Sequence, residues 1–377
     1  RQRQMCIRDS VISFTLGEPD FTASSNVVEA GCRAIREGKT KYSENAGLLA
    51  LRQAIAEYLH RTEGLSYDPA SQIVVTPGAM GALFLALKVL LNPGDEVIVN
   101  EPCWTNYIQQ IRMCGGVPVS VKTNAQRGFD LDVSAIAEAV TDKTKAIILN
   151  SPCNPTGAVA STETLLQLAE LAQKQDLVIL ADEVYKHILF DGRTYTSFAA
   201  LPGMKERTLV IDSLSKTYAM TGWRIGFMAG PESVAKAVTK LQGQTTSGIS
   251  TIAQRAAYAA YSGPQECVEQ MRRAFERRRD LVVELAAGIP GLKANVPQGA
   301  FYLFPDVSAF LGKNTPDGKA VSTDTDLSMY LLEHAHVATV PGSAFCLPGY
   351  IRLSYAAGDD ALREAFARIG RALAELY

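Results

Sequence analysis

The chain has 377 residues, enough for one large α/β unit with a substantial core and a second, smaller unit. Its 37 Lys and Arg nearly balance its 39 Asp and Glu, so no net field attracts nucleic acid or an anionic membrane, and we expect a small-molecule partner. The seven cysteines form no CxxC pair and no zinc-like Cys/His cluster, which predicts buried free thiols in a reducing compartment and no metal site.

The start of the sequence does not resemble the rest. Residues 1–10, RQRQMCIRDS, mix charges without an apolar period, and we interpret them as a non-native segment that takes no part in the fold. Nothing here has the layout of a signal peptide, and the apolar stretch from Gly81 to Leu91 is interrupted by Lys88 and too short to cross a bilayer. These features predict a cytoplasmic protein.

Short apolar runs alternate with helical patterns through the first two thirds of the chain. The expected strands are residues 73–75, 96–100, 117–121, 145–150, 177–182 and 209–212. This alternation is typical of βαβ units on a mainly parallel sheet, and continuously apolar runs indicate strands covered by helices on both faces. After residue 263, an Arg-rich helical stretch, two strand-like segments and a closing helix predict a separate α+β unit. We expect the arginines between Arg272 and Arg279 to form a solvated helix face and not a nucleic-acid patch.

One segment carries a candidate nucleophile. Residues 208–223, TLVIDSLSKTYAMTGW, contain two charges, Asp212 and Lys216, among apolar and hydroxyl residues. A lysine removed from water there loses its preference for the charged form, and the neutral amine is the species that attacks an aldehyde. Taken alone, Lys216 is better explained as a surface lysine. Arg224, eight residues on, offers a guanidinium that can grip a phosphate.

The longer run SLSKTYAMTGWRIGF resembles the Schiff-base segment of the class I and II pyridoxal-phosphate-dependent aminotransferases, closest to the bacterial aspartate-aminotransferase-like subgroup. The likeness extends from Val11 to near the C-terminus. It implies the type I pyridoxal-phosphate transferase fold, an α/β architecture whose large domain has a mainly parallel sheet covered by helices, beside a smaller α+β domain. We therefore expect residues 11–35 to form the N-terminal part of the small domain, 36–265 the large cofactor-binding domain and 266–377 the small C-terminal domain.

The resemblance also assigns roles around pyridoxal 5′-phosphate. Lys216 forms the Schiff base and then acts as acid and base, Asp182 pairs with the pyridine nitrogen, and Tyr185 bonds the phenolic oxygen. The residues implied for cofactor binding are Lys216, Gly78, Ala79, Met80, Trp104, Asn154, Asp182, Tyr185, Ser213, Ser215, Arg224 and, from the neighbouring subunit, Tyr42. Those implied for substrate binding are Gly17, Trp104, Asn154, Arg352 and Phe345. Taken singly, Asp182 is equally well explained as a helix N-cap, and Tyr185 as core packing.

The implied reaction moves an amino group from an L-amino acid to a 2-oxo acid by a ping-pong mechanism, with 2-oxoglutarate and glutamate as one pair, in a homodimer. Aspartate-specific members of the subgroup carry a lysine at the position of Met80. A thioether cannot pair with a carboxylate, so strict aspartate specificity is not expected, and an aromatic, aliphatic or broad donor range becomes possible.

Other functions remain as alternatives. A type I cysteine-conjugate β-lyase would use the same cofactor and the same central residues, and would eliminate from Cβ without an oxo-acid acceptor. A transcription regulator built on this domain would need a helix-turn-helix ahead of it, for which we see no room. A dinucleotide-binding protein would need a G-x-G-x-x-G after the first strand, and the sequence has none there.

Overall fold

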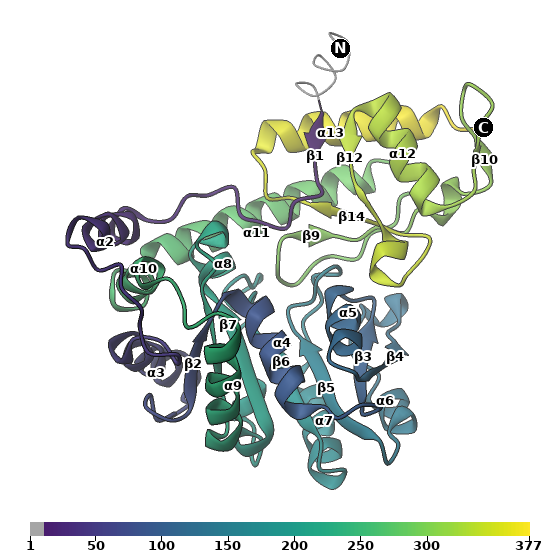
Figure 1. The fold of residues 1–377 in the computed structure, drawn as a ribbon. Helices are drawn as coiled ribbons and strands as arrows, with labels where there is room; N and C mark the ends of the chain where they lie inside the picture. Colours follow the sequence, from purple (N-terminus) through teal and green to yellow (C-terminus); the bar gives the residue numbers. More distant parts are fainter. Residues whose placement is uncertain (1–10) are drawn as a thin grey trace.

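The structure, a computed structural model, describes residues 11–377, so the prediction that residues 1–10 are non-native lies outside it. Its centre is a seven-stranded sheet with the order β2-β8-β7-β6-β5-β3-β4 (Figure 1). The strands are β2 (Ile73–Thr76), β3 (Glu96–Glu101), β4 (Val117–Lys122), β5 (Thr144–Asn150), β6 (Val178–Asp182), β7 (Thr208–Ser213) and β8 (Gly226–Ala229). Only β8 runs antiparallel to its neighbours, so the predicted mainly parallel sheet is confirmed. The sequence did not predict β8, whose four residues begin with a glycine, a residue that is rare in strands.

Helices cover both faces of this sheet. They are α3 (Leu49–Glu63), α4 (Gly78–Leu90), α5 (Asn106–Met113), α6 (Val133–Ala139), α7 (Thr162–Lys174), α8 (Leu214–Thr217), α9 (Glu232–Thr245) and α10 (Thr251–Ser262). One apolar cluster joins the sheet to α4, α5 and α9, and two others join it to α3 and α10 and to α6 and α7. Every residue of β7 is buried, as expected for a strand enclosed on both sides.

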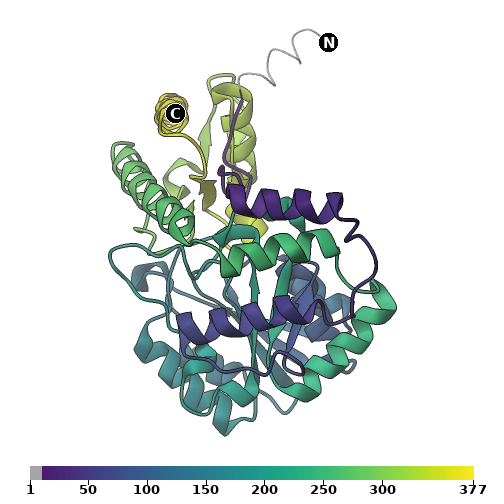
Figure 2. The same cartoon turned by 90° about the vertical axis from the view of Figure 1, so that its left-hand side faces the viewer.

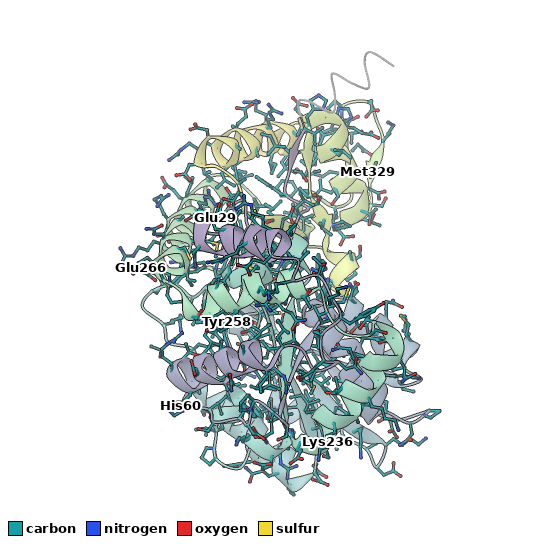
Figure 3. The ribbon with its side chains drawn as sticks, turned by 60° about the vertical axis from the view of Figure 1, so that its left-hand side comes forward. Glu29, His60, Lys236, Tyr258, Glu266 and Met329 are labelled. Carbon is teal, nitrogen blue, oxygen red and sulfur yellow. The ribbon has the colours of Figure 1, made fainter. Side chains whose placement is uncertain are left out.

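Helix α2 (Ser25–Arg36) adds a further layer outside α10. Figure 2 shows α2, α10 and α3 one above another on this side of the molecule, and Figure 3 labels Glu29, Tyr258 and His60 along the same succession. Val27 of α2 belongs to the same buried cluster as residues of α3 and α10. The helix is therefore anchored to the unit that contains the large sheet.

The C-terminal third forms the smaller α+β unit. Its strands are β9 (Tyr302–Leu303), β10 (Lys313–Asn314), β11 (Ala320–Val321), β12 (Val337–Ala338), β13 (Val340–Pro341) and β14 (Ile351–Ser354), and its helices are α11 (Glu266–Ala287), α12 (Asp324–Ala335) and α13 (Asp359–Ala374). Helix α12 begins with a capping box, in which Thr323 and Asp326 each satisfy the other's backbone N–H. Strand β1 (Ile12–Ser13) pairs with β12, which places the first described residues in this unit (Figure 1).

The arginines of α11 differ from the prediction. Arg273 and Arg277 are solvated as expected, with side chains 71% and 65% exposed. Arg278 and Arg279 are buried and form two-bond ion pairs, Arg278 with Asp20 and Arg279 with Asp191. The prediction of a fully solvated face was wrong, because one side of α11 packs against segments from elsewhere in the chain that supply these carboxylates.

Two further expectations concern thiols and membranes. The six cysteines within residues 11–377 are free, but only Cys103 and Cys114 are buried, and the other four are partly exposed. Within the same residues no helix has both the length and the apolarity required to cross a membrane.

Candidate active site

A pocket of about 480 Å³ opens at the carboxyl ends of the central strands, beneath the smaller unit. Ligands of open α/β sheets bind at this edge because loops diverge there. The predicted site residues that line it are Gly17, Ala79, Met80, Trp104, Asn154, Asp182, Tyr185, Ser213, Ser215, Lys216, Arg224 and Arg352. The structure thus brings residues from both ends of the chain into one cavity.

Lys216 lies in α8, directly after β7, and its ammonium group donates to the carbonyl oxygen of Gly17. Burial lowers the pKa of Lys216 to about 8; Glu18 opposes the shift, and the positive charges of Arg352 and Arg224 add to it. A substantial fraction of the amine is therefore neutral near physiological pH, as a nucleophile or proton acceptor requires.

Asp182, the last residue of β6, is the pocket's buried carboxylate. Tyr107 of α5 donates its hydroxyl to Asp182 Oδ2 at 2.6 Å, and the Val184 N–H donates to Oδ1 at 3.4 Å. Burial raises the pKa of Asp182 to about 6, against the lowering effect of these two donors. At neutral pH the group is mainly an anion, held in one orientation and suited to pair with a buried cation.

Arg352 of β14 reaches the pocket from the smaller unit. Its Nη1 donates to Asn154 Oδ1 at 3.0 Å and its Nη2 to the carbonyl oxygen of Thr15 at 2.7 Å. The guanidinium carbon lies 4.5 Å from the ring centre of Tyr302 and 4.8 Å from that of Phe345. Because Asn154 turns its oxygen toward Arg352, its amide N–H groups are left to donate elsewhere in the pocket.

The opposite end of the pocket is built to receive an anion. Helix α4 begins at Gly78 without a side-chain cap, and Ala79 and Met80 of its first turn line the cavity. A Cβ added at Gly78 would lie 2.8 Å from Arg224 Nη2, and Gly78 has φ +74°. Glycine here allows the guanidinium to sit against the start of the helix, next to the hydroxyl-bearing Ser213 and Ser215.

Three predicted residues lie outside the pocket lining. Gly78 lies directly behind it, against Arg224. Phe345 is buried and packs on Arg352 from the far side. Tyr42 is 91% exposed, in a separate surface hollow that it shares with residues 246–252.

Several pocket residues were not identified from the sequence. Tyr107 bonds Asp182, Tyr302 pairs its hydroxyl with that of Tyr185 at 2.7 Å, and Glu18 accepts from Thr221 at the mouth. One signal was available for Tyr107. It stands three residues after Trp104, and residues at that spacing share one face at a helix start. Tyr302 offered no such signal, because its neighbours in the strand are equally apolar and equally buried.

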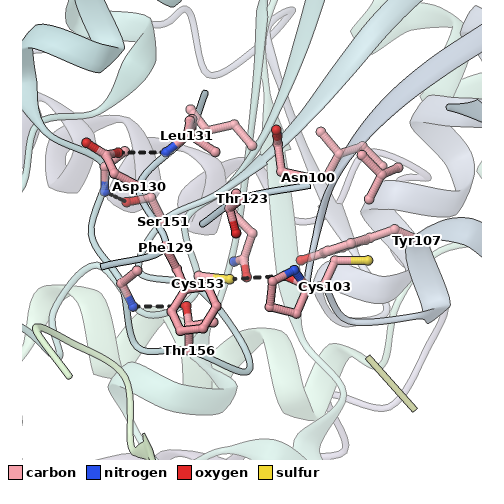
Figure 4. A pocket seen from close by; sticks show the side chains of 17 residues that line it. Asn100, Cys103, Tyr107, Thr123, Phe129, Asp130, Leu131, Ser151, Cys153 and Thr156 are labelled. Atoms are coloured by element: carbon pink, nitrogen blue, oxygen red, sulfur yellow. Dashed lines mark hydrogen bonds between the residues drawn. The ribbon is translucent and has the colours of Figure 1, made fainter. Parts of the chain in front are cut away.

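A second cavity, of about 30 Å³, lies on the other side of Tyr107 (Figure 4). Its labelled lining residues include Asn100, Cys103, Cys153 and Thr156. Its volume suits a water molecule or two and excludes an amino acid. Of these two cavities, only the one around Lys216 has room for a cofactor and a substrate together.

Comparison with known proteins agrees with this geometry. A family model described as aminotransferase class I and II matches residues 9–369. The chain is 45% identical over 369 residues to a protein of Aquifex aeolicus (strain VF5) named probable aspartate/prephenate aminotransferase, covering 97% of this chain and 92% of that one. It is 44% identical to an aspartate aminotransferase of Geobacillus stearothermophilus, covering 96% and 91%.

Solved structures show the same fold. The aspartate aminotransferase of Rhizobium meliloti superposes with a TM-score of 0.95 at 42% identity, over 100% of this chain and 95% of that one. An aromatic aminotransferase of Pyrococcus horikoshii OT3 gives a TM-score of 0.92 at 39% identity, over 98% and 99%. The chain belongs to the class I and II aminotransferases. It is a pyridoxal-phosphate-dependent transaminase with the type I fold, and the β-lyase alternative is not favoured.

The pocket itself fits this cofactor. It presents a buried carboxylate for a pyridinium, a lysine with a lowered pKa for an aldehyde, and an uncapped helix start with Arg224 for a phosphate. These three features come from different strand ends, and only the fold brings them within reach of one small molecule.

Proposed function

We propose that this transaminase takes its amino group from L-amino acids with aromatic or aliphatic side chains, without restriction to aspartate, and uses 2-oxoglutarate and glutamate as its second pair. The observation that carries the proposal is Met80, whose side chain is 38% exposed and lines the pocket. A flexible thioether favours contact with apolar groups and offers no charge to a distal carboxylate.

The charges of the pocket support this substrate range. Of the described residues that line it, three are cationic: Lys216, Arg224 and Arg352. Each already has a proposed role: Lys216 at the cofactor aldehyde and the substrate Cα, Arg224 at the phosphate and Arg352 at the α-carboxylate. The remaining charged residue at the mouth is Glu18, an anion that repels a second carboxylate. Glutamate is one methylene longer than aspartate, so we expect its distal carboxylate to extend farther toward solvent.

The site residues have these proposed roles. When bound, pyridoxal 5′-phosphate supplies an electron sink for the charge that develops at the substrate Cα. Asp182 keeps the pyridine nitrogen protonated, and Asn154 and Tyr185 donate to the phenolic oxygen. Lys216 first supplies the amine and then takes the proton from the substrate Cα. Arg352 grips the α-carboxylate with two parallel N–H groups.

The remaining residues complete the proposed site. Trp104 stacks on the cofactor ring, Gly17 lies over the substrate, and Phe345 supports Arg352. Ser213, Ser215, Arg224 and the amides of Gly78, Ala79 and Met80 bind the phosphate. Gly17, Arg352 and Phe345 of the smaller unit thus hold the substrate together with Trp104 and Asn154 of the larger unit, which also holds the cofactor. Closure of the two units would exclude water from the reaction.

A donor panel tests the proposal. Purified protein loaded with pyridoxal 5′-phosphate is mixed with single L-amino acids, and the cofactor's absorption change is followed before any 2-oxo acid is added. Phenylalanine, tyrosine, leucine and methionine should convert the cofactor, with kcat/KM at least equal to that of aspartate. A clear preference for aspartate would refute the substrate assignment. Lys216→Ala should lose the covalent cofactor band, and Lys236→Ala, at an exposed lysine of α9, should retain it.

We also propose a homodimer in which Tyr42 reaches the cofactor phosphate of the neighbouring subunit. The support is its exposure, since a tyrosine that is 91% exposed beside a surface hollow lined by residues 40–43 and 246–252 can reach a partner. Sedimentation of the holoenzyme should give the mass of a dimer. The variant Tyr42→Phe should bind the cofactor more weakly and should still sediment as a dimer. A monomer with full activity would contradict the proposal.

The division into domains and the cellular location are further proposals. A boundary between the large and the C-terminal unit near residue 265 follows the start of α11, at Glu266. The packing of α2 on α10 favours ending the N-terminal part of the small domain before Ser25, not at residue 35. The proposed cytoplasmic location is tested by fractionating cells that express the chain with a tag.

A further inference from the structure

Four charged side chains meet in the interior behind the active site. Lys186 Nζ lies 3.1 Å from Asp212 Oδ2, 3.3 Å from Glu63 Oε1 and 3.6 Å from Glu183 Oε2. None of the four side chains is more than 3% exposed. We call Lys186, Asp212, Glu63 and Glu183 the buried charge cluster. The roles assigned above to the pocket residues use none of its members.

The cluster lies on the face of the sheet opposite Asp182. Asp182 pairs with Ile211 across β6 and β7, and successive residues of a strand point to opposite faces. Asp212 therefore points away from the pocket, toward the apolar cluster of α3 and α10. The ring of Tyr58, in α3, lies 5.0 Å from Lys186 Nζ on that side.

Stability alone is a poor explanation for this arrangement. Three carboxyl groups share one ammonium, and charges buried without full compensation cost free energy. Burial raises the pKa of Glu183 above its usual range, which makes its ionised form costly. The geometry is nevertheless tightly defined. Ser197 donates to Glu183 Oε1 at 2.6 Å, and the Ser213 N–H donates to Asp212 Oδ1 at 2.7 Å.

Members of the cluster alternate along the chain with site residues. Glu183 directly follows Asp182, Lys186 directly follows Tyr185, and Asp212 directly precedes Ser213. Two backbone segments thus present pocket residues on one side and cluster residues on the other. The ion pairs of Lys186 within the cluster therefore also set the distance between these two backbone segments.

We propose that Lys186 is a positioning residue: its ion pair with Asp212 ties the end of β6 to the end of β7 and so aligns Asp182 with Lys216. The inference rests on the proposed roles of these two residues in cofactor binding. Lys186 touches neither cofactor nor substrate, and it acts through the backbone that carries Asp182 and Tyr185.

The cluster offers its own matched control. Asp212→Asn and Glu63→Gln each remove one negative charge from the same ammonium with almost no change of shape. Asp212 also raises the pKa of Asp182 through its charge, so the two variants are compared at a pH at which Asp182 is ionised in both. The two variants differ in which element loses its ion pair with Lys186. Asp212 belongs to β7, which leads directly to Lys216, whereas Glu63 is the last residue of α3, which carries no proposed site residue.

The experiment compares the two variants with the wild type at pH 8, where Asp182 is ionised. The dissociation constant of pyridoxal 5′-phosphate is expected to be on the order of tenfold higher in Asp212→Asn than in Glu63→Gln, with kcat reduced and KM little changed. The unfolding midpoints of the two cofactor-free variants should be similar. Equal cofactor dissociation constants and equal kcat values in the two variants would overturn the proposal.

A second pair of variants, at Lys186, tests the proposal if Asp212→Asn does not fold. Lys186→Met should weaken cofactor binding, and Lys186→Arg, which keeps the charge, should restore it to within about threefold of the wild type. Wild-type affinity in Lys186→Met would overturn the inference. Failure of the proposed function is separately visible, because the wild-type protein would then form no covalent adduct at Lys216 after reduction with borohydride.

Discussion

Tyr107→Phe removes a single oxygen atom from the surroundings of Asp182. The hydroxyl of Tyr107 donates to Asp182 Oδ2 at 2.6 Å, and its ring packs edge-on against Trp104 with centres 5.4 Å apart. Phenylalanine retains the ring contact and deletes the donor. The substitution therefore tests how much this hydrogen bond contributes to keeping Asp182 ionised, with little disturbance of packing.

The size of the effect follows from the charge of the acceptor. A hydrogen bond to a charged group contributes about 1.5–3 kcal/mol, and a shift of one pKa unit corresponds to about 1.4 kcal/mol. With its donor, the pKa of Asp182 is raised by burial to about 6. Losing the donor should raise that pKa by a further 1 to 2 units, roughly, into the range of neutral pH. Asp182 would then be largely protonated at pH 7 in the cofactor-free protein.

The assay is the dissociation constant of pyridoxal 5′-phosphate, measured by fluorescence from pH 5.5 to 8.5. Affinity requires ionised Asp182, so it should fall as the pH drops through the pKa of that group, and Tyr107→Phe should move this fall to higher pH by one to two units. Tyr355→Phe is the matched control, since its buried hydroxyl donates to the Ala300 carbonyl oxygen and not to Asp182. An unshifted pH profile in Tyr107→Phe would refute the reasoning.

Other predictions follow from the same pocket. The rate at which the apoprotein captures pyridoxal 5′-phosphate should rise with pH, reach half its maximum near pH 8 and level off above it, because the lowered pKa of Lys216 makes half of its amine neutral at that pH. Stopped-flow absorbance would show no midpoint near pH 8 if the lysine were an ordinary one. Gly78→Ala should weaken cofactor binding at least tenfold in equilibrium titration, because the added Cβ would displace Arg224. A loss of this size is on the order of one charge-assisted hydrogen bond, and unchanged affinity would contradict the placement of Arg224. Met80→Lys should raise kcat/KM for aspartate relative to phenylalanine by about tenfold or more, and an unchanged ratio would show that this position does not face the substrate side chain.

Much of the fold could be predicted from local pattern. The strands from β2 to β7 appeared as apolar runs between helical segments, because a strand buried on both faces has to be apolar along its length. The segment around Lys216 was recognisable because the run SLSKTYAMTGWRIGF resembles the Schiff-base segment of this family. Strand β8 was missed, since it begins with a glycine, a residue that is rare in strands.

The arginines of α11 and the partners of Asp182 mark the limit of local pattern. Arg277 and Arg278 are adjacent and chemically identical, yet one is solvated and the other is buried against Asp20, 258 residues away. Tyr107 and Asp182 are likewise 75 residues apart, and their hydrogen bond exists only because the fold brings Tyr107 of α5 to the end of β6. No spacing along the chain encodes either contact.

The sequence by itself determined the family and the cofactor and predicted the main site residues, because these depend on residue identity within short motifs. Only the tertiary structure decided which groups hold those residues in place and with what charge. Hydrogen bonding, burial and ion pairing depend on distance in space, and the pKa values of Lys216 and Asp182 are shifted first by burial and then by neighbours that include residues from distant segments. The buried ion pair of Lys186 with Asp212, behind the pocket, became visible for the same reason.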